Sequence, residues 1–526
     1  MPVLQTYNMS YQFDNGEMLF QSLSCSMTKP RVGIIGRNGV GKSLFAAILC
    51  GDIMPTSGKV TLPHSFGVYR QQRSQLPSGD LSIAQFLSKS HVLDALKQVE
   101  AGKFSAHLFD VIGDQWDLLK RLTKQLDEMG LPQDPDFPCA QLSGGQLTQL
   151  QLWQLFESQV ALLILDEPSN HLDTKTKQWL INSMRSFKGA ILLISHDREL
   201  LNEQDEIWAL SGLGLQIFGG NYSAYAEHKR LEKDALVRQI ASIDKQKRHL
   251  KRQAQRNREK AEQRAVQGKK LRQDGSQPKV MLDSMKDKAT AGTASRNKNE
   301  QRRQTHLQDK ENSLNKRKEQ FKEQFNKQSL YLGSNQSSSR KVISILDAIL
   351  PFGSRAPINL QIYAHDKVHL IGNNGSGKST LLKSLQGELT FLQGELNLNT
   401  SLYYLDQHFS VICPERSILD NLMQHCEEMK ENDARTLLAG IGFRQDGVFR
   451  LANKLSGGEM MKLAMLIASH QGTQPFLLLD EPDNHLDIDS KIMLAQALVK
   501  YPGGFILISH DADFAKESGV TQQVTL

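Results

Sequence analysis

Four short motifs each occur twice in this chain, in the same order and at similar spacing. They read Gly-x-Asn-Gly-x-Gly-Lys-Ser, Leu-Ser-Gly-Gly, Leu-Asp-Glu-Pro-x-Asn-His-Leu-Asp and Ile-Ser-His-Asp. The pairs lie at residues 36–43 and 372–379, 142–145 and 455–458, 165–173 and 479–487, and 194–197 and 508–511. A duplication of this kind predicts two copies of one domain on a single chain.

Within each copy, short apolar runs alternate with stretches of helical pattern, which is typical of an α/β sheet with helices on its faces. Residues 32–35 and 368–371 are expected to be strands that run into the glycine-rich turns, and helices should follow those turns. We therefore predict an α/β fold with two nucleotide-binding domains, at residues 1–225 and 341–526.

The first copy is longer than the second in one place. Gln71 and Leu142 are 71 positions apart, whereas Gln407 and Leu455 are 48 apart. About 23 extra residues must therefore lie within residues 82–131 of the first domain. A plain surface loop and a docking arm are both consistent with this insertion.

The segment between the copies, residues 226–340, is strongly basic. Residues 227–340 hold 30 Lys and Arg against 14 Asp and Glu, whereas the rest of the chain is net acidic. Residues 226–271 and 296–328 contain one Gly and no Pro, so we predict a helical hairpin with an irregular tip near residues 275–296. Segregated positive charge of this kind indicates a polyanionic partner such as RNA.

Several classes of protein are disfavoured by the composition. The first residues lack the basic and apolar pattern of a secretory signal, and the longest apolar runs have the length of buried strands rather than membrane spans. The five cysteines form no Cys-x-x-Cys pair, which argues against a zinc ribbon or a disulfide framework. We expect a soluble cytoplasmic protein.

The glycine-rich segments have the chemistry of a phosphate-binding loop. Glycines allow backbone N–H groups to surround phosphate oxygens, and the N-terminus of the next helix adds a positive end. Lys42 and Lys378 would reach the β- and γ-phosphates of ATP, and the hydroxyls of Ser43 and Ser379 would coordinate Mg²⁺.

Two carboxylates follow the apolar strand of each copy. Asp166 and Asp480 would hold Mg²⁺ at the carboxyl ends of the strands, and Glu167 and Glu481 would polarise the attacking water. His196 and His510 follow another apolar strand in equivalent Ser-His-Asp contexts, where they could report on the γ-phosphate. These residues predict phosphoryl transfer from ATP to water, and we expect both sites to be active.

The Leu-Ser-Gly-Gly motif, with the motifs before and after it, resembles the ATP-binding cassette superfamily. That resemblance implies composite sites, in which the Leu-Ser-Gly-Gly motif of one cassette covers the nucleotide held by the other. It also implies that Gln71 and Gln407 contact Mg²⁺, and that Phe13 and Phe352 stack on adenine.

The expected catalytic residues are Glu167, His196, Glu481 and His510. The expected metal-binding residues are Ser43, Gln71, Asp166, Ser379, Gln407 and Asp480. The expected nucleotide-binding residues are Phe13, Gly36, Asn38, Gly39, Gly41, Lys42, Ser43, Leu44, Gln71, Ser143, Gly144, Gly145 and Gln146 for the first cassette, and Phe352, Gly372, Asn374, Gly375, Gly377, Lys378, Ser379, Thr380, Gln407, Ser456, Gly457, Gly458 and Glu459 for the second.

Two tandem cassettes, Asn-His-Leu-Asp after each Asp-Glu pair and a charged helical linker together resemble the ABC-F family. That resemblance implies a monomer whose two cassettes pair internally, and a linker that reaches ribosomal RNA and the P-site tRNA on the ribosome. Some members protect the ribosome against antibiotics. The chain departs from the family pattern at Ser169 and Asp483, where Thr is usual, and at Leu44.

Two other functions remain open at this point. Fused cassettes also drive some membrane transporters, although a basic linker has no evident purpose there. Cassette ATPases associated with DNA are the second alternative, but they usually carry coiled coils or zinc modules inside a cassette. The choice between a general translation factor and an antibiotic-resistance protein also stays open.

Overall fold

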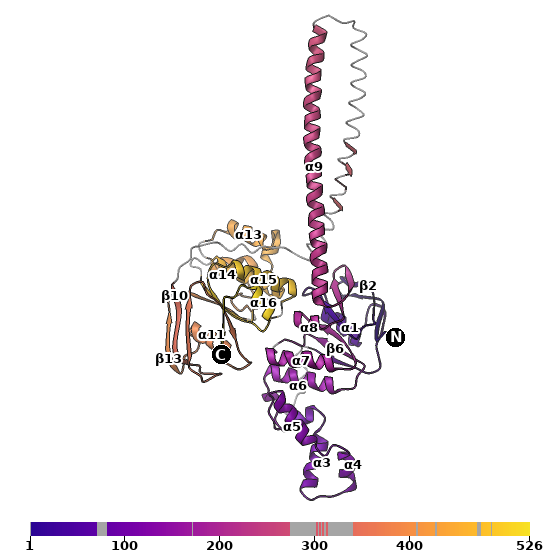
Figure 1. Cartoon of the computed structure of the whole chain (residues 1–526), viewed down its shortest axis with the longest axis vertical. Coiled ribbons are helices and arrows are strands. Elements are labelled where there is room, and N and C mark those ends of the chain that lie inside the picture. Colours follow the sequence, from indigo (N-terminus) through magenta and orange to yellow (C-terminus); the bar gives the residue numbers. More distant parts are fainter. Residues whose placement is uncertain are drawn as a thin grey trace. The chain divides into compact units, whose positions relative to one another are not determined.

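The computed structural model describes residues 2–70, 81–170, 172–273, 340–406, 409–426, 429–470, 475–484 and 486–526, with short pieces at 301–302, 305–306, 308–309 and 312–313. The chain divides into two compact units, Met1–Tyr222 with Gln328–Leu526, and Ser223–Lys327. Both repeats lie in the first unit, and the N- and C-termini belong to different repeats (Figure 1).

Each repeat contains one large sheet that is mainly parallel. In the first repeat the strand order is β5-β6-β7-β3-β8-β9, where only the β8–β9 pair is antiparallel. In the second repeat the order is β14-β15-β16-β12-β17, and all pairs are parallel. The strands of these sheets are β3 (Arg31–Ile35), β5 (Phe66–Tyr69), β6 (Leu162–Asp166), β7 (Ala190–Ile194), β8 (Glu206–Ser211), β9 (Gly214–Gly219), β12 (Lys367–Ile371), β14 (Leu402–Leu405), β15 (Phe476–Asp480), β16 (Phe505–Ile508) and β17 (Gln522–Thr525).

A smaller antiparallel sheet accompanies each large one. Its order is β2-β1-β4 in the first repeat and β11-β10-β13 in the second. These strands are β1 (Leu4–Gln12), β2 (Met18–Met27), β4 (Ser57–Thr61), β10 (Lys341–Ile349), β11 (Ile358–Tyr363) and β13 (Gln393–Leu398). The equivalent order of sheets in both halves reflects the duplicated sequence.

The central strands read as continuous apolar runs because helices cover both faces of a parallel sheet. Every residue of β6 and β7 is buried, and so is every residue of β16. The covering helices are α1 (Lys42–Cys50), α6 (Gly144–Glu157), α7 (Thr174–Ser186), α8 (Arg198–Asn202), α11 (Lys378–Gln386), α14 (Gly457–Ser469), α15 (Ile488–Lys500) and α16 (Ala512–Glu517). This arrangement, together with the family comparison given below, confirms the predicted α/β class.

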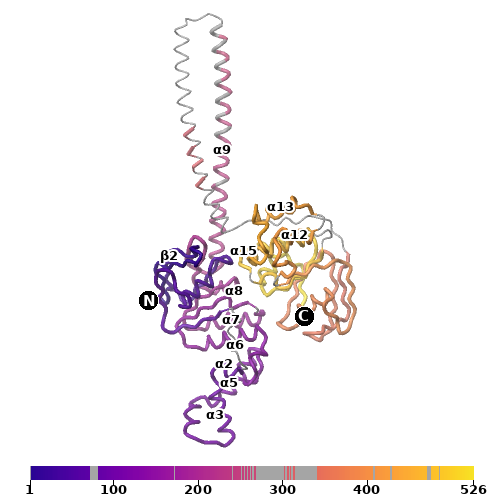
Figure 2. Tube along the Cα trace, turned by 180° about the vertical axis from the view of Figure 1, so that it is seen from behind, coloured from indigo at the N-terminus to yellow at the C-terminus, as the bar shows by residue number. Residues whose placement is uncertain are grey.

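The helical part of the first repeat includes the residues predicted to hold the insertion. It contains α2 (Ile83–Phe86), α3 (Ser90–Glu100), α4 (Ala106–Ile112), α5 (Leu118–Glu128) and the 3₁₀ helix η2 (Cys139–Gln141). Leu93, Ile112, Leu122 and Leu126 pack there in an apolar cluster of their own. Both views show α3 at the end of a projection from the first repeat (Figures 1 and 2).

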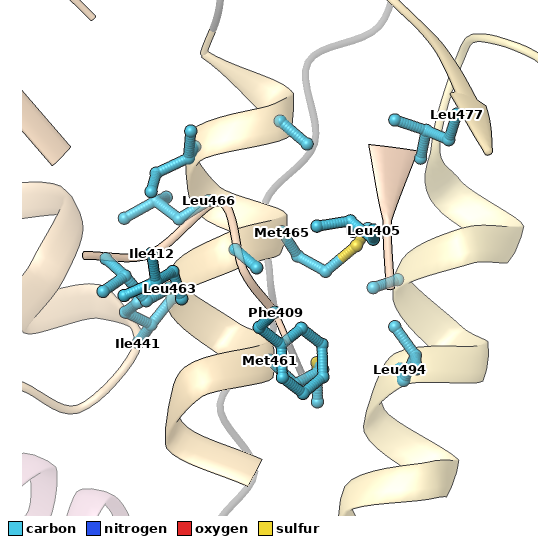
Figure 3. Close-up of a cluster of buried hydrophobic side chains, with 14 of the residues drawn as sticks. Leu405, Phe409, Ile412, Ile441, Met461, Leu463, Met465, Leu466, Leu477 and Leu494 are labelled. Carbon is cyan, nitrogen blue, oxygen red and sulfur yellow. The ribbon is translucent and has the colours of Figure 1, made fainter. Parts of the chain in front are cut away.

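The corresponding part of the second repeat is more compact and packs directly on the core of the cassette. Its helices are α12 (Ile418–His425), α13 (Glu431–Gly440), η3 (Gln445–Phe449) and η4 (Ala452–Lys454). Met461 and Met465 of α14 lie beside Phe409 and Leu405 in this cluster (Figure 3). The cluster fixes the helix that begins with the second Leu-Ser-Gly-Gly motif.

The segment between the repeats begins with α9 (Tyr222–Gln273), a helix of 52 residues (Figure 1). The described pieces after residue 300 are also helical, and Lys247 Nζ donates to Gln308 Oε1 at 3.0 Å. The predicted tip near residues 275–296 lies outside the described residues. Across the described residues, none of the helices combines the length and apolar character needed to cross a bilayer.

Candidate functional site

The two glycine-rich loops have the same geometry. In each cassette the loop connects a central strand, β3 or β12, to a helix, α1 or α11. Lys42 Nζ donates to the carbonyl oxygens of Gly36 at 2.8 Å and Arg37 at 3.0 Å. Lys378 Nζ makes the equivalent bonds to Gly372 and Asn373 at the same two distances. Both lysines are buried and point back into their own loop.

The last glycine of each loop is required by its backbone. Gly41 has φ of 95° and Gly377 has φ of 106°, in the left-handed region that L side chains rarely adopt. A Cβ on Gly41 would also lie 2.7 Å from Leu19, and one on Gly377 would lie 2.7 Å from Leu350. Gly39 and Gly375 both have φ of 82°. The loop can therefore curve around an anion only with glycine at these positions.

The acidic residue at the end of each buried strand lies beside the serine of the loop. Ser379 Oγ donates to Asp480 Oδ1 at 3.1 Å, and in the first cassette the Ser43 hydroxyl opposes the rise that burial causes in the pKa of Asp166. Asp166 Oδ1 is buried and has no hydrogen-bond partner among the described residues. A serine hydroxyl beside a carboxylate oxygen of this kind is a donor set that fits Mg²⁺. Gln71 and Gln407, the other predicted metal ligands, lie outside the described residues.

The glutamate that follows each of these aspartates faces the histidine from the neighbouring strand. His196 Nε2 lies 3.7 Å from Glu167 Oε1, and His510 Nε2 lies 3.4 Å from Glu481 Oε1. Both glutamates have φ of 50°, although neither is glycine. A non-glycine residue in this region is strained, and such strain is concentrated at functional sites.

Burial controls the protonation of the first pair. It raises the pKa of Glu167 to about 7, against the opposing effect of the nearby Lys42. Burial, with the positive charges of Lys42 and Lys491, holds the pKa of His196 well below its usual range. His196 is therefore neutral at pH 7 and can donate one N–H, while Glu167 is able to accept a proton from water.

A cavity of about 520 Å³ lies over the first glycine-rich loop and is lined by both repeats. The first repeat contributes the predicted residues Phe13, Asn38, Gly39, Gly41, Lys42, Ser43, Leu44, Asp166, Glu167 and His196. The second repeat contributes Asp483, Asn484, Leu486, Lys491, His510 and Asp511. The volume lies within the range of cavities that hold small-molecule ligands.

The Leu-Ser-Gly-Gly residues are not among the described residues that line this cavity. Ser143 and Ser456 instead cap the helices α6 and α14, each in a reciprocal pair with Gln146 or Glu459. The two glycines that follow each serine, at positions 144–145 and 457–458, lie in the first turns of these helices. Helix N-termini of this kind can bind an anion. The contact of each Leu-Ser-Gly-Gly motif with the nucleotide of the other cassette stays a prediction.

The two predicted adenine contacts differ in their surroundings. Phe13 lines the cavity, with 39% of its surface exposed, and packs edge-on against Tyr11. Phe352 is 66% exposed, and its carbonyl oxygen lies close to Gly377 of the second loop. Thr380 follows Ser379 in α11 and is partly buried.

Sequence analysis missed the aspartates that end the two Asn-His-Leu-Asp motifs. Asp487 Oδ2 accepts from the backbone N–H of Asn38 at 3.0 Å, and Asp173 Oδ2 accepts from that of Asn374 at 3.2 Å. The other oxygen of each aspartate caps its own helix, α15 or α7. Each glycine-rich loop is therefore contacted by the opposite repeat. Their repetition in equivalent motifs was the signal that could have identified them.

Two buried lysines also escaped the sequence analysis. Lys177 Nζ lies 2.8 Å from Asp197, and Lys491 Nζ lies 2.8 Å from Asp511. Each aspartate directly follows the site histidine of its cassette. The lysines, which come from α7 and α15, therefore fix the segments that carry His196 and His510.

Comparisons with known proteins agree with this geometry. Residues 21–170 and 356–484 match the model of a family described as ABC transporter. The chain is 29% identical to the putative ATP-binding protein YdiF of Bacillus subtilis, over 98% of this chain and 78% of that protein. It is 28% identical to ABC transporter F family member 5 of Arabidopsis thaliana, over 93% of this chain and 70% of that protein.

Among solved structures, the fold resembles the archaeal ribosome recycling factor aABCE1, crystallised with the ribosomal stalk protein aP1. The TM-score is 0.51 and the sequence identity 16%, over 98% of this chain and 87% of the other. At this identity the likeness shows a common fold.

Proposed function

Because the chain belongs to the ABC transporter family and is an ABC-F type ATPase, we propose that it uses ATP to act on the ribosome through its basic interdomain segment. ATP bound between the cassettes favours one conformation and hydrolysis releases it, so the γ-phosphate is the ligand that distinguishes the two states. The protein would act in the cytoplasm as a monomer, with its two cassettes paired internally.

The charge of α9 is the observation that carries this proposal. The helix holds 16 Lys and Arg against six Asp and Glu, and it extends for about 80 Å at 1.5 Å per residue. A rod with this excess of cations binds nucleic-acid phosphates mainly by releasing counterions. Exposed Leu231, Val237 and Val266 offer no aromatic surface for base stacking. Recognition of the RNA backbone and shape, including ribosomal RNA and the P-site tRNA, therefore suits it best.

The likeness to aABCE1 adds support at the level of the fold. That protein is a ribosome recycling factor, and its structure matches this chain over 98% of this chain's length. The likeness makes a ribosomal partner more plausible than a membrane permease or free DNA.

At each ATP site we assign roles to the residues of this chain. Lys42 and Lys378 bind the phosphates, and Glu167 and Glu481 orient and deprotonate the attacking water. His196 and His510, which lie beside these glutamates, would donate to the γ-phosphate. Ser43 with Asp166, and Ser379 with Asp480, would hold Mg²⁺, which would neutralise negative charge on the phosphates.

The sites are proposed to be shared between the cassettes. Asp173 and Asp487 already contact the loop of the opposite repeat. We assign the residues at 143–146 and 456–459 to the opposite nucleotide, because their helix N-termini suit an anion. ATP would then hold the two halves together.

Sedimentation of a trapped protein tests this function. The Glu167→Gln, Glu481→Gln protein should co-sediment with ribosomes in sucrose gradients with ATP, and less so with ADP. Neutralising three exposed cations of α9 (Arg252→Gln, Arg256→Gln, Lys260→Gln) should weaken the association and its dependence on salt.

A matched variant controls for net charge. Lys59→Gln, Lys175→Gln and Lys188→Gln remove the same charge from exposed positions in the first cassette, and should leave sedimentation unchanged. Migration of the trapped protein with membranes would support a transporter subunit instead, and migration with free DNA would support a DNA-associated ATPase. Either result would contradict the proposal.

A further inference from the structure

The aspartate at the end of β15 is held on both sides by its own cassette. Tyr404 lies in β14, the strand that pairs with β15, and its hydroxyl donates to Asp480 Oδ2 at 2.9 Å. Ser379 Oγ donates to the other oxygen, Oδ1, at 3.1 Å. With both oxygens engaged, the carboxylate has a fixed orientation at the place proposed for the metal.

The first cassette lacks the tyrosine. Tyr404 pairs with Leu478, two residues before Asp480, and Val68 pairs with Ile164, two residues before Asp166. Val68 therefore occupies the equivalent position, and its side chain has no hydrogen-bond donor. The Oδ1 atom of Asp166 is buried without a hydrogen-bond partner in the part of the chain that the structure describes.

The charges around the two carboxylates also differ. Lys42 and Arg70 act on Asp166, whereas Lys383 acts on Asp480 together with the negative charge of Glu481. The hydrogen bond from the phenol is separate from these charges, because replacement of Tyr404 by Phe removes the bond and leaves the charged groups in place.

We propose that Tyr404 is a positioning residue for the divalent metal, and that it makes the second ATP site bind Mg²⁺ more tightly than the first. A carboxylate already oriented by a hydrogen bond loses less freedom when a metal binds. Partners of this kind change metal affinity by about ten- to a hundredfold when they are removed. The inference rests on the metal role proposed above for Asp480 and Ser379.

Manganese binding measures each site separately. Free Mn²⁺ is followed by electron paramagnetic resonance in the Glu167→Gln, Glu481→Gln protein with ATP. Ser43→Ala in this background weakens the first metal site and leaves the second to be measured, and Ser379→Ala does the reverse. We expect the second site to bind Mn²⁺ more tightly. Tyr404→Phe should weaken it about tenfold and leave the first site unchanged.

Tyr69→Phe is the matched control. Tyr69 lies next to Val68, and its hydroxyl contacts Thr148 rather than Asp166, so its loss should change neither site. Equal Mn²⁺ affinity at the second site with and without the Tyr404 hydroxyl would overturn the inference. An equal loss at both sites would also overturn it, because it would indicate a general structural effect. If no Mn²⁺ binds with ATP at either site, the metal role itself fails, whereas the ribosome proposal is tested independently by sedimentation.

Discussion

The two cassettes are the same where they would touch phosphate and different in what surrounds that place. Lys42 and Lys378 make equivalent bonds at equal distances, and both site glutamates have the same φ of 50°. Around them, Asp480 has a tyrosine partner that Asp166 lacks. The chemistry of ATP restricts the residues in contact with it, while their neighbours are free to diverge after duplication.

The contacts between the cassettes show the same contrast. Asp173 and Asp487 make a reciprocal pair of contacts with the two loops. Arg198 of α8 forms an ion pair with Glu517 of α16 at 2.5 Å, but Ala512 occupies the position equivalent to Arg198 in the second cassette. The contacts of Asp173 and Asp487 therefore follow the internal symmetry of the chain, whereas the Arg198–Glu517 pair has no equivalent on the other side among the described residues.

The largest expected effect tests whether both cassettes hydrolyse ATP. Glu167→Gln together with Glu481→Gln should slow turnover by roughly two to four orders of magnitude, because neither site keeps a carboxylate to deprotonate water. ATP binding, measured by equilibrium dialysis, should be retained. Unchanged turnover in the double variant would refute the assigned role. Unequal losses in the two single variants would show that the cassettes differ in rate.

A second test compares how the same two glutamates affect the free energy of unfolding at different pH. Burial raises the pKa of Glu167 to about 7, so the folded protein binds this proton more tightly than the unfolded chain does. The destabilising contribution is absent below about pH 4.5, grows up to about pH 7 and is constant above it. Glu167→Gln should therefore stabilise the protein by about 3 kcal/mol at pH 8 and very little at pH 4.5.

Thermal unfolding at the two pH values measures this effect. Glu481→Gln is the matched variant. In the unchanged protein, the Asn484 amide donates to the Glu481 carboxylate. A stabilisation of Glu167→Gln that is equal at pH 4.5 and pH 8 would contradict the raised pKa as its cause.

A third comparison concerns the reciprocal contacts. Asp173→Ala and Asp487→Ala should each reduce ATPase activity about tenfold, because each removes a bond to the opposite loop and a helix cap. Asn at either position keeps the oxygen that caps the helix, but an amide NH₂ group replaces the oxygen that accepts the loop N–H. If the Asn variants retain full activity, the cap explains the loss, and the cross-cassette contact is unimportant.

The smallest effect concerns the ion pair between Arg198 and Glu517. A double-mutant cycle of Arg198→Ala and Glu517→Ala should give a coupling energy of about 1 kcal/mol, because Arg198 is largely buried and Glu517 is half-exposed. Arg185→Ala, which breaks the pair with Glu203 within one cassette, is the control. Additive effects of Arg198→Ala and Glu517→Ala on ATP-dependent stability would show that this contact does not link the halves.

Most of the fold and the centre of the site could be predicted from the sequence. Lys42, Asp166, Glu167 and His196 belong to motifs whose spacing follows from strand, turn and helix geometry, and the structure brings them together in one cavity. The helix predicted at residues 226–271, the first part of the basic linker, lies within α9. Local patterns were sufficient because these features depend on neighbours in the sequence.

Other features depend on how distant segments meet. The bond from Tyr404 to Asp480 depends on the register of two strands whose residues are 76 positions apart. The contact of Asp487 with Asn38 joins residues 449 positions apart. The repeated motifs mark Asn38 and Asp487 as candidates but do not pair them, and Tyr404 lies outside these motifs, so only the three-dimensional structure shows which residues meet.

The single Arg198–Glu517 pair has a consequence for how such a protein can evolve. In a symmetric homodimer one codon change alters both copies of an interface, because the same surface is used twice. Here the two surfaces are encoded separately, so a change in one leaves the other intact. Because the halves are fused, selection can change one nucleotide site, or one cassette's side of the interface, without changing the equivalent residues of the other cassette.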